Sequence, residues 1–246
     1  MSYKEFSYYY DYFNYTADYD LLADTIHNWA TSEKLDGKIA CDLGCGTGEL
    51  AICLCEKDWD VIAVDCSEEM LDVFMDKRGE LGYYNILILN QDITQLDMFG
   101  TVDLFTCTFD TVNHLDGNES VQKLFDRVSL FMHPDGVFIF DMNTEYKHRN
   151  ILGNNVFTFD EEEADCIWKN TLDENNNRTK VEIDIKDKQS GEQYSEAFYE
   201  CFYSLDSIKA MLKKSGLSVC KIVDGENFDE ISETSQRYLF MVKKEQ

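Results

Sequence analysis

The most constraining feature of the chain is a glycine-rich loop between an apolar run and a helical pattern. The run ends in Cys41-Asp42-Leu43, and the loop is Gly44-Cys45-Gly46-Thr47-Gly48. Glycine lacks a Cβ atom, so the loop can adopt left-handed angles and bring its main chain close to a ligand. A strand, a tight loop and a helix start in this order predict a doubly wound parallel sheet with a ligand site at the strand ends.

The charge before the first glycine indicates what kind of ligand is bound. The spacing is Gly-x-Gly-x-Gly instead of Gly-x-Gly-x-x-Gly, and Asp42 stands just before it. A pyrophosphate at the helix N-terminus would be repelled by this carboxylate, whereas an ammonium and a sulfonium group would be attracted. The loop therefore favours S-adenosylmethionine over NAD and disfavours an NAD-dependent oxidoreductase.

Two further acids follow the next apolar runs. Asp65 follows the apolar run Val61-Ile62-Ala63-Val64 and lies 21 residues after Gly44, about the interval at which an acid meets ribose in this architecture. Its carboxylate can accept hydrogen bonds from both ribose hydroxyls. Asp92 follows the run 86–89 and can accept from an adenine amino group. Each acid alone could equally be a helix cap or turn residue. All three in order, with the glycine loop, indicate an adenosyl ligand.

These motifs resemble the class I S-adenosylmethionine-dependent methyltransferases. The resemblance covers about Asp36 to Asp141 and rests on Asp42–Gly48, Val64-Asp65, Gln91-Asp92-Ile93, Phe109–Leu115 and His133–Phe138. It implies that Gly44, Gly46 and Gly48 shape the methionine pocket, that Asp65 binds ribose and that Asp92 contacts adenine. The residues expected at the cofactor are Tyr10, Tyr19, Asp42, Gly44, Cys45, Gly46, Gly48, Asp65, Cys66, Met70, Gln91, Asp92, Ile93 and Phe109.

The order of elements predicts an α/β fold with a Rossmann-like, mostly parallel seven-stranded sheet. Four segments are expected: a tyrosine-rich helical lid (1–35), the cofactor-binding core (36–150), an inserted antiparallel sheet (151–203) and a return to the core (204–246). The insertion is indicated by Val181, Ile183 and Ile185, which alternate with charged residues as in a sheet with one wet face. Such a sheet could cap a small substrate or form a dimer contact.

Tyrosines are concentrated at the N-terminus. Seven of the fourteen fall in the first 19 residues, namely Tyr3, Tyr8, Tyr9, Tyr10, Tyr12, Tyr15 and Tyr19. Their rings could attract a sulfonium and their hydroxyls could reach the methionine carboxylate. The alternative is an amphipathic helix with some rings packed and others in water. Tyr10-Asp11 and Asp18-Tyr19 resemble the segment that closes over the cofactor in glycine N-methyltransferase and aminosugar N,N-dimethyltransferases, so Tyr10 and Tyr19 are the expected lid residues.

The polar stretch after the fourth expected strand would face the transferred methyl group. His114 could act as a general base because its free pKa lies near neutrality, although loop histidines more often bond to the backbone. Asp110 could hold substrate or the methionine end of the cofactor, or stabilise the turn. Asn113 is the third candidate in this loop. Methyl transfer is an in-line displacement, for which alignment supplies much of the rate and a base is optional.

The composition of the chain limits which partners and cofactors are expected. The net charge is −26, and no basic stripe is available for nucleic acid. The nine cysteines lack the paired spacing of a zinc site, so no metal is expected. No apolar run approaches a membrane span and no signal peptide is evident, which favours the cytoplasm. A monomer or homodimer is expected.

The sequence thus predicts methyl transfer from S-adenosylmethionine to a nitrogen or oxygen of a small molecule. The alternative is a noncatalytic adenosyl-ligand sensor or scaffold that acts through the inserted sheet.

Overall fold

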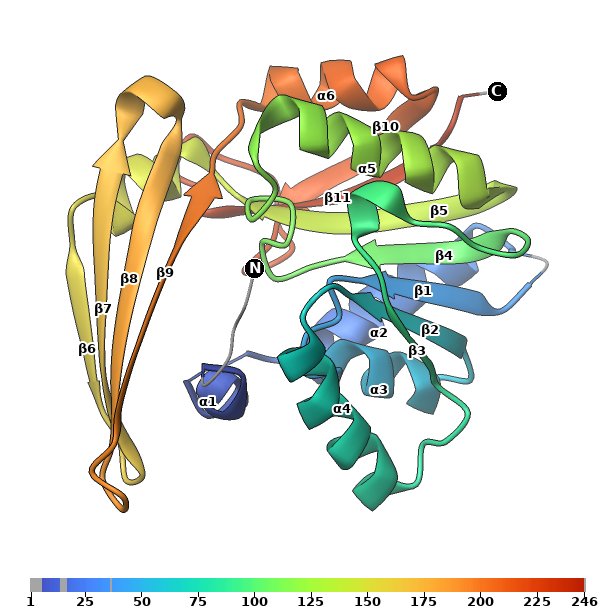
Figure 1. Cartoon of the computed structure of the whole chain (residues 1–246). Helices are drawn as coiled ribbons and strands as arrows, with labels where there is room; N and C mark the ends of the chain where they lie inside the picture. The colour runs from blue at the N-terminus through green and yellow to red at the C-terminus, as the bar shows by residue number, and fades with distance from the viewer. Residues whose placement is uncertain (1–5, 14–16, 36, 246) are drawn as a thin grey trace.

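The larger of two sheets forms the centre of the molecule (Figure 1). The computed structural model describes residues 6–13, 17–35 and 37–245. The sheet has the order β10-β11-β5-β4-β1-β2-β3, in which β1 to β5 are parallel and β11 is antiparallel to both its neighbours. Its strands are β1 (Ile39–Leu43), β2 (Asp60–Asp65), β3 (Leu87–Asn90), β4 (Val102–Cys107), β5 (Met132–Asn143), β10 (Leu217–Asp224) and β11 (Arg237–Lys244). The predicted doubly wound sheet is confirmed.

Helices cover both faces of this sheet. On one face lie α2 (Tyr19–Ser32), α3 (Glu49–Glu56) and α4 (Glu68–Leu81); on the other lie α5 (Gly117–Phe131) and α6 (Leu205–Lys214) (Figure 1). Side chains cap three of them, since Asp18, Ser67 and Ser204 accept a hydrogen bond from an N–H of the first turn.

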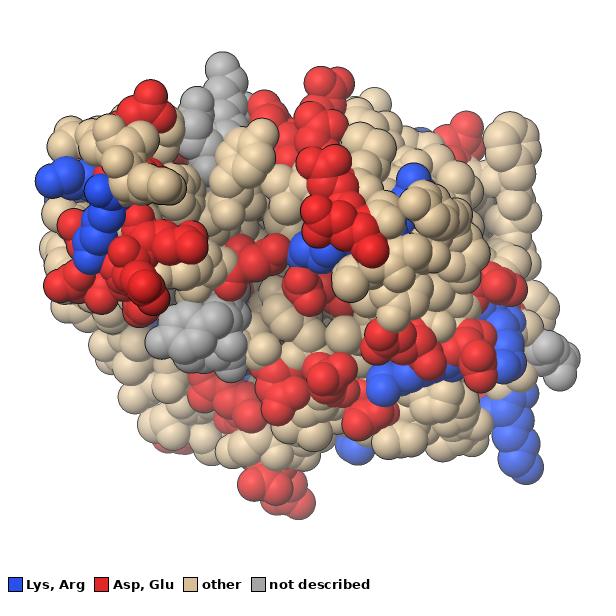
Figure 2. Space-filling view, turned by 90° about the horizontal axis from the view of Figure 1, so that it is seen from below, with Lys and Arg blue, Asp and Glu red and all other residues tan. Residues whose placement is uncertain are grey.

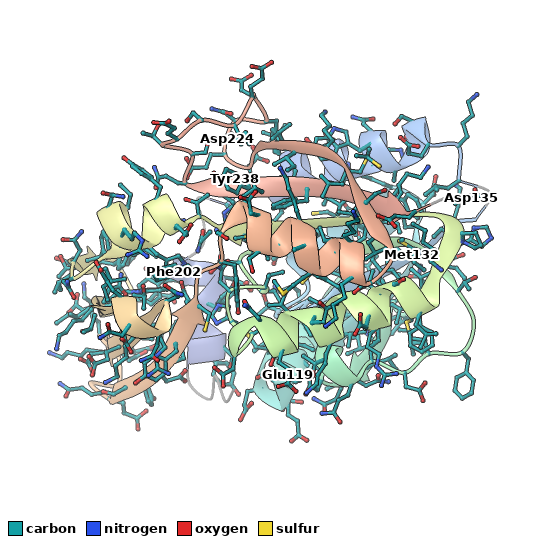
Figure 3. All side chains as sticks on the ribbon, turned by 90° about the horizontal axis from the view of Figure 1, so that it is seen from above. Glu119, Met132, Asp135, Phe202, Asp224 and Tyr238 are labelled. Carbon is teal, nitrogen blue, oxygen red and sulfur yellow. The ribbon has the colours of Figure 1, made fainter. Side chains whose placement is uncertain are left out.

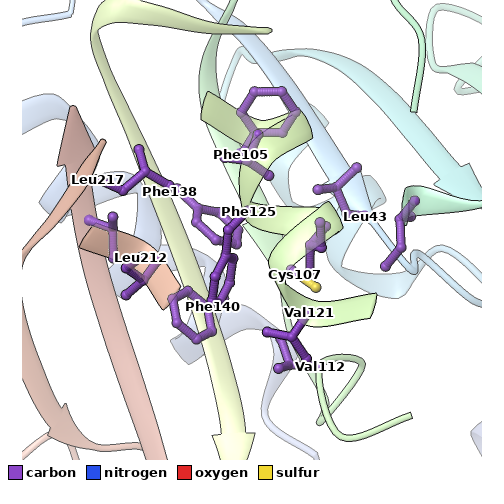
Figure 4. Close-up of a cluster of buried hydrophobic side chains, with 14 of the residues drawn as sticks. Leu43, Phe105, Cys107, Val112, Val121, Phe125, Phe138, Phe140, Leu212 and Leu217 are labelled. Carbon is purple, nitrogen blue, oxygen red and sulfur yellow. The ribbon is translucent and has the colours of Figure 1, made fainter. Parts of the chain in front are cut away.

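Aromatic packing fixes the strands that carry the site. Phe140 of β5 stacks on Phe240 of β11 at 4.5 Å and on Phe138 at 4.8 Å between ring centroids. Phe125 of α5 packs against both Phe138 and Phe140 (Figure 4). Because a close-packed core of this kind resists displacement, the strand ends are held in fixed positions.

A four-stranded antiparallel sheet stands beside the core in the order β6-β7-β8-β9 (Figure 1). Its strands are β6 (Val156–Asp160), β7 (Ala164–Asp173), β8 (Arg178–Asp187) and β9 (Gln193–Cys201). Cys166, Val181, Ile183, Ile185 and Phe198 form its buried face. The predicted alternation of buried and wet residues on β8 is confirmed.

Helix α1 (Phe6–Phe13) lies in the angle between the two sheets (Figure 1). Its Tyr9, Tyr10 and Phe13 pack on the buried face of the smaller sheet. Short turns η1 (Ile93–Gln95), η2 (Lys147–Leu152) and η3 (Glu174–Asn176) complete the elements. Among the residues described, no helix is both long and apolar enough to cross a membrane.

Candidate functional site

A cavity of about 310 Å³ lies beyond the carboxyl ends of the central strands. Ten of the residues that the sequence predicted line it: Tyr10, Gly44, Gly46, Asp65, Cys66, Met70, Asp92, Ile93, Phe109 and His114. A smaller adjoining cavity of about 40 Å³ brings in Tyr19, Asp42 and Cys45. Residues from β1, β2, the β3 end, the β4 end and α1 thus meet at one place.

The three glycines of the loop are required for different reasons. All have a positive φ, which favours glycine. A Cβ on Gly44 would lie 2.4 Å from Thr111, and one on Gly48 would lie 2.3 Å from Phe74 of α4. At Gly46 a Cβ would meet nothing within 4 Å. Gly46 therefore leaves space in the cavity, whereas Gly48 lies outside both cavities and permits close packing of α4.

Asp65 holds the glycine loop from the end of β2. Its Oδ2 accepts a hydrogen bond from the Gly46 N–H at 2.9 Å, and its Oδ1 accepts one from the Ser67 N–H at 2.8 Å. Burial raises the pKa of Asp65 despite these bonds. Each carboxylate oxygen can accept a further bond, so Asp65 can meet a ligand in the cavity while it fixes the loop.

Asp92 combines a cap with a position at the cavity. Its Oδ1 accepts from the N–H and hydroxyl of Thr94, and its Oδ2 accepts from the Gln95 amide at 3.0 Å. Gln91 instead forms two hydrogen bonds with the backbone of Asp97 and lines neither cavity. Asp92 thus caps the short turn η1 and also lines the larger cavity.

Asp42 is a buried carboxyl group at the smaller cavity. Thr106 donates its hydroxyl to Oδ1 at 2.7 Å. Burial raises the pKa of Asp42 to about 7, and the charge of Asp65 adds to this effect. Tyr19 lines the same cavity, with its ring 4.6 Å from that of Phe109. A cationic group placed here would favour the ionised form of Asp42.

The tyrosines of α1 connect the two sheets. Tyr9 donates its hydroxyl to Asp187 of β8 at 2.6 Å, and Tyr12 accepts from the Glu163 N–H. On the core side, Asp11 accepts from the Thr47 hydroxyl and pairs with Lys77 at 2.7 Å. Tyr8 is 73% exposed, whereas Tyr10 lines the cavity. Tyr3 and Tyr15 lie outside the described residues.

The loop after β4 is held in an uncommon conformation by an ionic cluster. Phe109 and Asp110 both have a φ of 53°, and their N–H groups donate to the Asp141 carboxylate at 3.0 and 2.7 Å. Arg237 of β11 pairs with Asp110 and Asp141, each at 2.9 Å. Although burial opposes ionisation, Arg237 holds the pKa of Asp110 below its ordinary value. Asp110 lines neither cavity, so the structure places it against this guanidinium.

His114 reaches the cavity from the same loop. Its Nε2 lies 3.7 Å from Asp110 Oδ2, and its ring packs 5.2 Å from Phe198 of β9. Burial lowers the pKa of His114, although the charge of Asp110 acts in the opposite direction. The imidazole is therefore mainly neutral at pH 7 and able to accept a proton.

Asn113 does not face the cavity as expected. It is fully buried, its Nδ2 donates to the carbonyl oxygens of Asn143 and Cys201, and its Oδ1 accepts from the Asn143 N–H at 2.8 Å. A primary amide matches the donors and acceptors of two backbone segments at once. Asn113 therefore joins the ends of β5 and β9 instead of contacting a ligand.

Three titratable residues near His114 were not predicted: Lys147, His148 and Glu200. Asp110, His114 and Glu200 bring one ligand-type atom each to within 4.8 Å of one another. Arg237 pairs with Oδ1 of Asp110, whereas Oδ2 lies toward His114 Nε2. The absence of a metal stays a prediction. No local motif marks these residues, because they come from distant elements.

Comparisons with known proteins agree on the class. The profile of a methyltransferase domain family matches residues 40–136. A protein of Geobacillus sp. (strain WCH70) named as a methyltransferase is 31% identical over 248 residues, which cover 99% of this chain and 100% of the relative. The crystal structure of an S-adenosylmethionine-dependent methyltransferase from Clostridium acetobutylicum ATCC 824 is 30% identical, with a TM-score of 0.89 and coverage of 97% and 96%.

A more distant structure shares the fold. It is S-adenosylmethionine-bound CalS10, an amino pentose methyltransferase from Micromonospora echinaspora, with 18% identity, a TM-score of 0.74 and coverage of 95% of each chain. The chain belongs to the class I S-adenosylmethionine-dependent methyltransferases.

Proposed function

We propose that the protein transfers a methyl group from S-adenosylmethionine to a nitrogen or oxygen of a small-molecule acceptor. The observation that carries this proposal is the cavity that Gly46, Asp65 and Asp92 share with His114. Carboxylate oxygens that can accept hydrogen bonds from an adenosyl group thus line the same cavity as a neutral imidazole that can take a proton from the methyl acceptor. The fold is shared by an amino pentose methyltransferase, which supports a small-molecule acceptor that carries an amino group.

The residues present fit the cofactor. The space above Gly46 admits a ligand next to the main chain, and Asp65 and Asp92 offer hydrogen-bond acceptors for ribose and adenine. Asp42 and Tyr19 would hold the cationic methionine end in the smaller cavity, with Tyr10 closing over it from α1. When bound, S-adenosylmethionine supplies a methyl group on a positively charged sulfur.

The chain itself would align the acceptor and take its proton. Tyr10 of α1 lines the cavity, and α1 packs on the smaller sheet, so this helix would shield the site from water. His114, mainly neutral at pH 7, would accept the proton that the acceptor loses. An imidazole is a much weaker base than an alkoxide, so a nitrogen acceptor suits it better than an alcohol.

Two features support the remaining assignments. The net charge of −26 disfavours phosphate contacts with nucleic acid. All nine cysteines are free thiols, which supports a reducing compartment, and we propose the cytoplasm.

Calorimetric titration with S-adenosylhomocysteine tests the cofactor site. We expect binding of the wild-type protein in the micromolar range, on the order of −8 kcal/mol, and at least tenfold weaker binding of Asp65→Asn. Asp60→Asn is the matched control, because Asp60 begins the same strand at its opposite, exposed end. Unaltered binding by Asp65→Asn would exclude the ribose role, and a folded protein that binds none would contradict the proposal.

A further inference from the structure

The residue that stands out beyond the cofactor site is Glu200, near the end of β9. It is 3% exposed, and its Oε2 has no hydrogen-bond partner among the described residues. His148 Nε2, at 4.0 Å, likewise has none within that part of the chain. Burial of a carboxyl group without a partner is costly, so the site is built for something that the protein alone does not supply. Phe202, just after this strand, lies where the smaller sheet meets the core (Figure 3).

The geometry around Glu200 fits an ammonium group. Ligand-type atoms of Asp110, His114 and Glu200 lie within 4.8 Å of one another. A nitrogen can lie roughly 2.8 Å from three atoms this close together, the length of a charge-assisted N–H···O bond. A carboxylate oxygen and the unprotonated nitrogen of a neutral imidazole accept hydrogen bonds, so the complementary group is a triple donor.

We propose that Asp110, His114 and Glu200 bind the protonated primary amine of the methyl acceptor, with Glu200 supplied by the inserted sheet. The inference rests on the proposed function and deepens it, because it makes the acceptor an amine. His114 lines the cofactor cavity as well, so the amine nitrogen is held beside the space expected for the methyl group. His114 then takes one ammonium proton, after which the neutral amine turns its freed lone pair from His114 toward the space expected for the methyl group.

The charges around this amine site leave room for one more cation. Arg237 lies between Asp110 and Asp141, so one positive charge faces two negative ones. Lys147, which donates to Asn143 at 3.0 Å, is a second cation near this cluster, although burial lowers its pKa. An ammonium group would balance the charge of Glu200 once that carboxyl is ionised. Acidic side chains also predominate on the face shown in Figure 2, which would attract a cationic acceptor.

Glu200 makes binding dependent on pH. Burial, followed by the charge of Asp110, raises the pKa of Glu200 to about 8. The carboxyl is therefore largely protonated at pH 7 in the free protein and ionises when a cation binds, with release of a proton. The affinity for an amine should rise with pH up to about 8 and level off above it.

The test uses the full chain saturated with S-adenosylhomocysteine, with cyclohexylamine as probe and cyclohexanol as its neutral counterpart. We expect the wild-type protein to prefer the amine at least tenfold at pH 8 and Glu200→Gln to lose that preference, together with the rise of affinity between pH 6.5 and 8. Glu182→Gln removes an acid from the outer face of β8, where it pairs with Lys180, and should behave as wild type.

The outcomes separate this inference from the proposed function. Normal S-adenosylhomocysteine binding without amine preference in the wild-type protein overturns the amine site alone, whereas loss of S-adenosylhomocysteine binding overturns the proposed function. If Glu200→Gln does not fold, calorimetry of the wild-type protein at pH 7 in two buffers of different ionisation enthalpy decides. Proton release on amine binding supports the site, and its absence refutes it.

Discussion

Replacement of Asp42 by asparagine should stabilise the free protein and weaken cofactor binding. The pKa of Asp42 is raised from 3.8 to about 7 in the folded state, mainly by burial. The folded protein thus binds more protons than the unfolded chain between these values, so its stability falls as pH rises through this window. About three pKa units at about 1.4 kcal/mol each give up to about 4 kcal/mol above pH 7. The amide of an asparagine at this position carries no charge and escapes this penalty.

The same change should remove the partner of the cationic methionine end. A hydrogen bond to a charged group contributes about 1.5–3 kcal/mol, so we expect roughly 10- to 100-fold weaker binding of S-adenosylhomocysteine. In the wild-type protein, affinity should rise between pH 5 and 7 as Asp42 ionises, and this rise should vanish in Asp42→Asn.

Urea denaturation of the ligand-free proteins at pH 5 and 8, with calorimetry at the same pH values, measures both effects. We expect the stability difference between variant and wild type to grow with pH. A variant that is no more stable than wild type at pH 8 and binds S-adenosylhomocysteine equally well would refute the reasoning about burial and charge.

Three other substitutions test the loop and the ionic cluster. Gly48→Ala should destabilise the protein by more than about 1 kcal/mol, since φ is positive and Cβ would overlap Phe74, and urea denaturation would show it. Gly46→Val should leave the fold intact apart from local strain but block ligand entry, visible as lost S-adenosylhomocysteine binding in a protein with a native circular dichroism spectrum. Arg237→Met should lower the free energy of unfolding by about 3–5 kcal/mol, because two buried carboxylates lose their ionic partner. Thermal and urea unfolding at pH 7 measure this loss, and a smaller loss would show that water enters the cluster. Chemical shifts of the Phe109 amide should move in the same variant.

Most residues that line the larger cavity could be predicted because their determinants are local in sequence. Each acid at the end of a strand sits next to the apolar run that forms the strand, and parallel strands bring their carboxyl ends to one edge. Asp65 and Asp92 thus reach the same cavity although 27 residues separate them. The pattern could not show why each position requires glycine. Gly48, for example, is needed because a Cβ would overlap Phe74, and it does not line the cavity.

The ionic cluster and the proposed amine site could not be predicted in this way. Arg237 meets Asp110 across 127 residues, and Asn113 meets Cys201 across 88. A buried arginine on a strand, or a glutamate in an alternating strand, carries no local signal of its partner. Asn113 was wrongly expected at the cavity because loop position indicates proximity to the site but not side-chain direction.

These long-range bonds explain how an inserted sheet can govern chemistry at a core strand. Asp141 and Arg237 of the core hold the first residues of the loop 109–115 in their left-handed conformation. The middle of the loop is held by Asn113, which donates a hydrogen bond to Cys201 of β9. His114 stands between these two anchors, so its position depends on both sheets at once. A change in the inserted sheet would therefore move the histidine as well as Glu200 of the proposed amine site. It follows that new acceptors require joint changes in loop and insertion, while the Asp65 end of the cavity can stay the same.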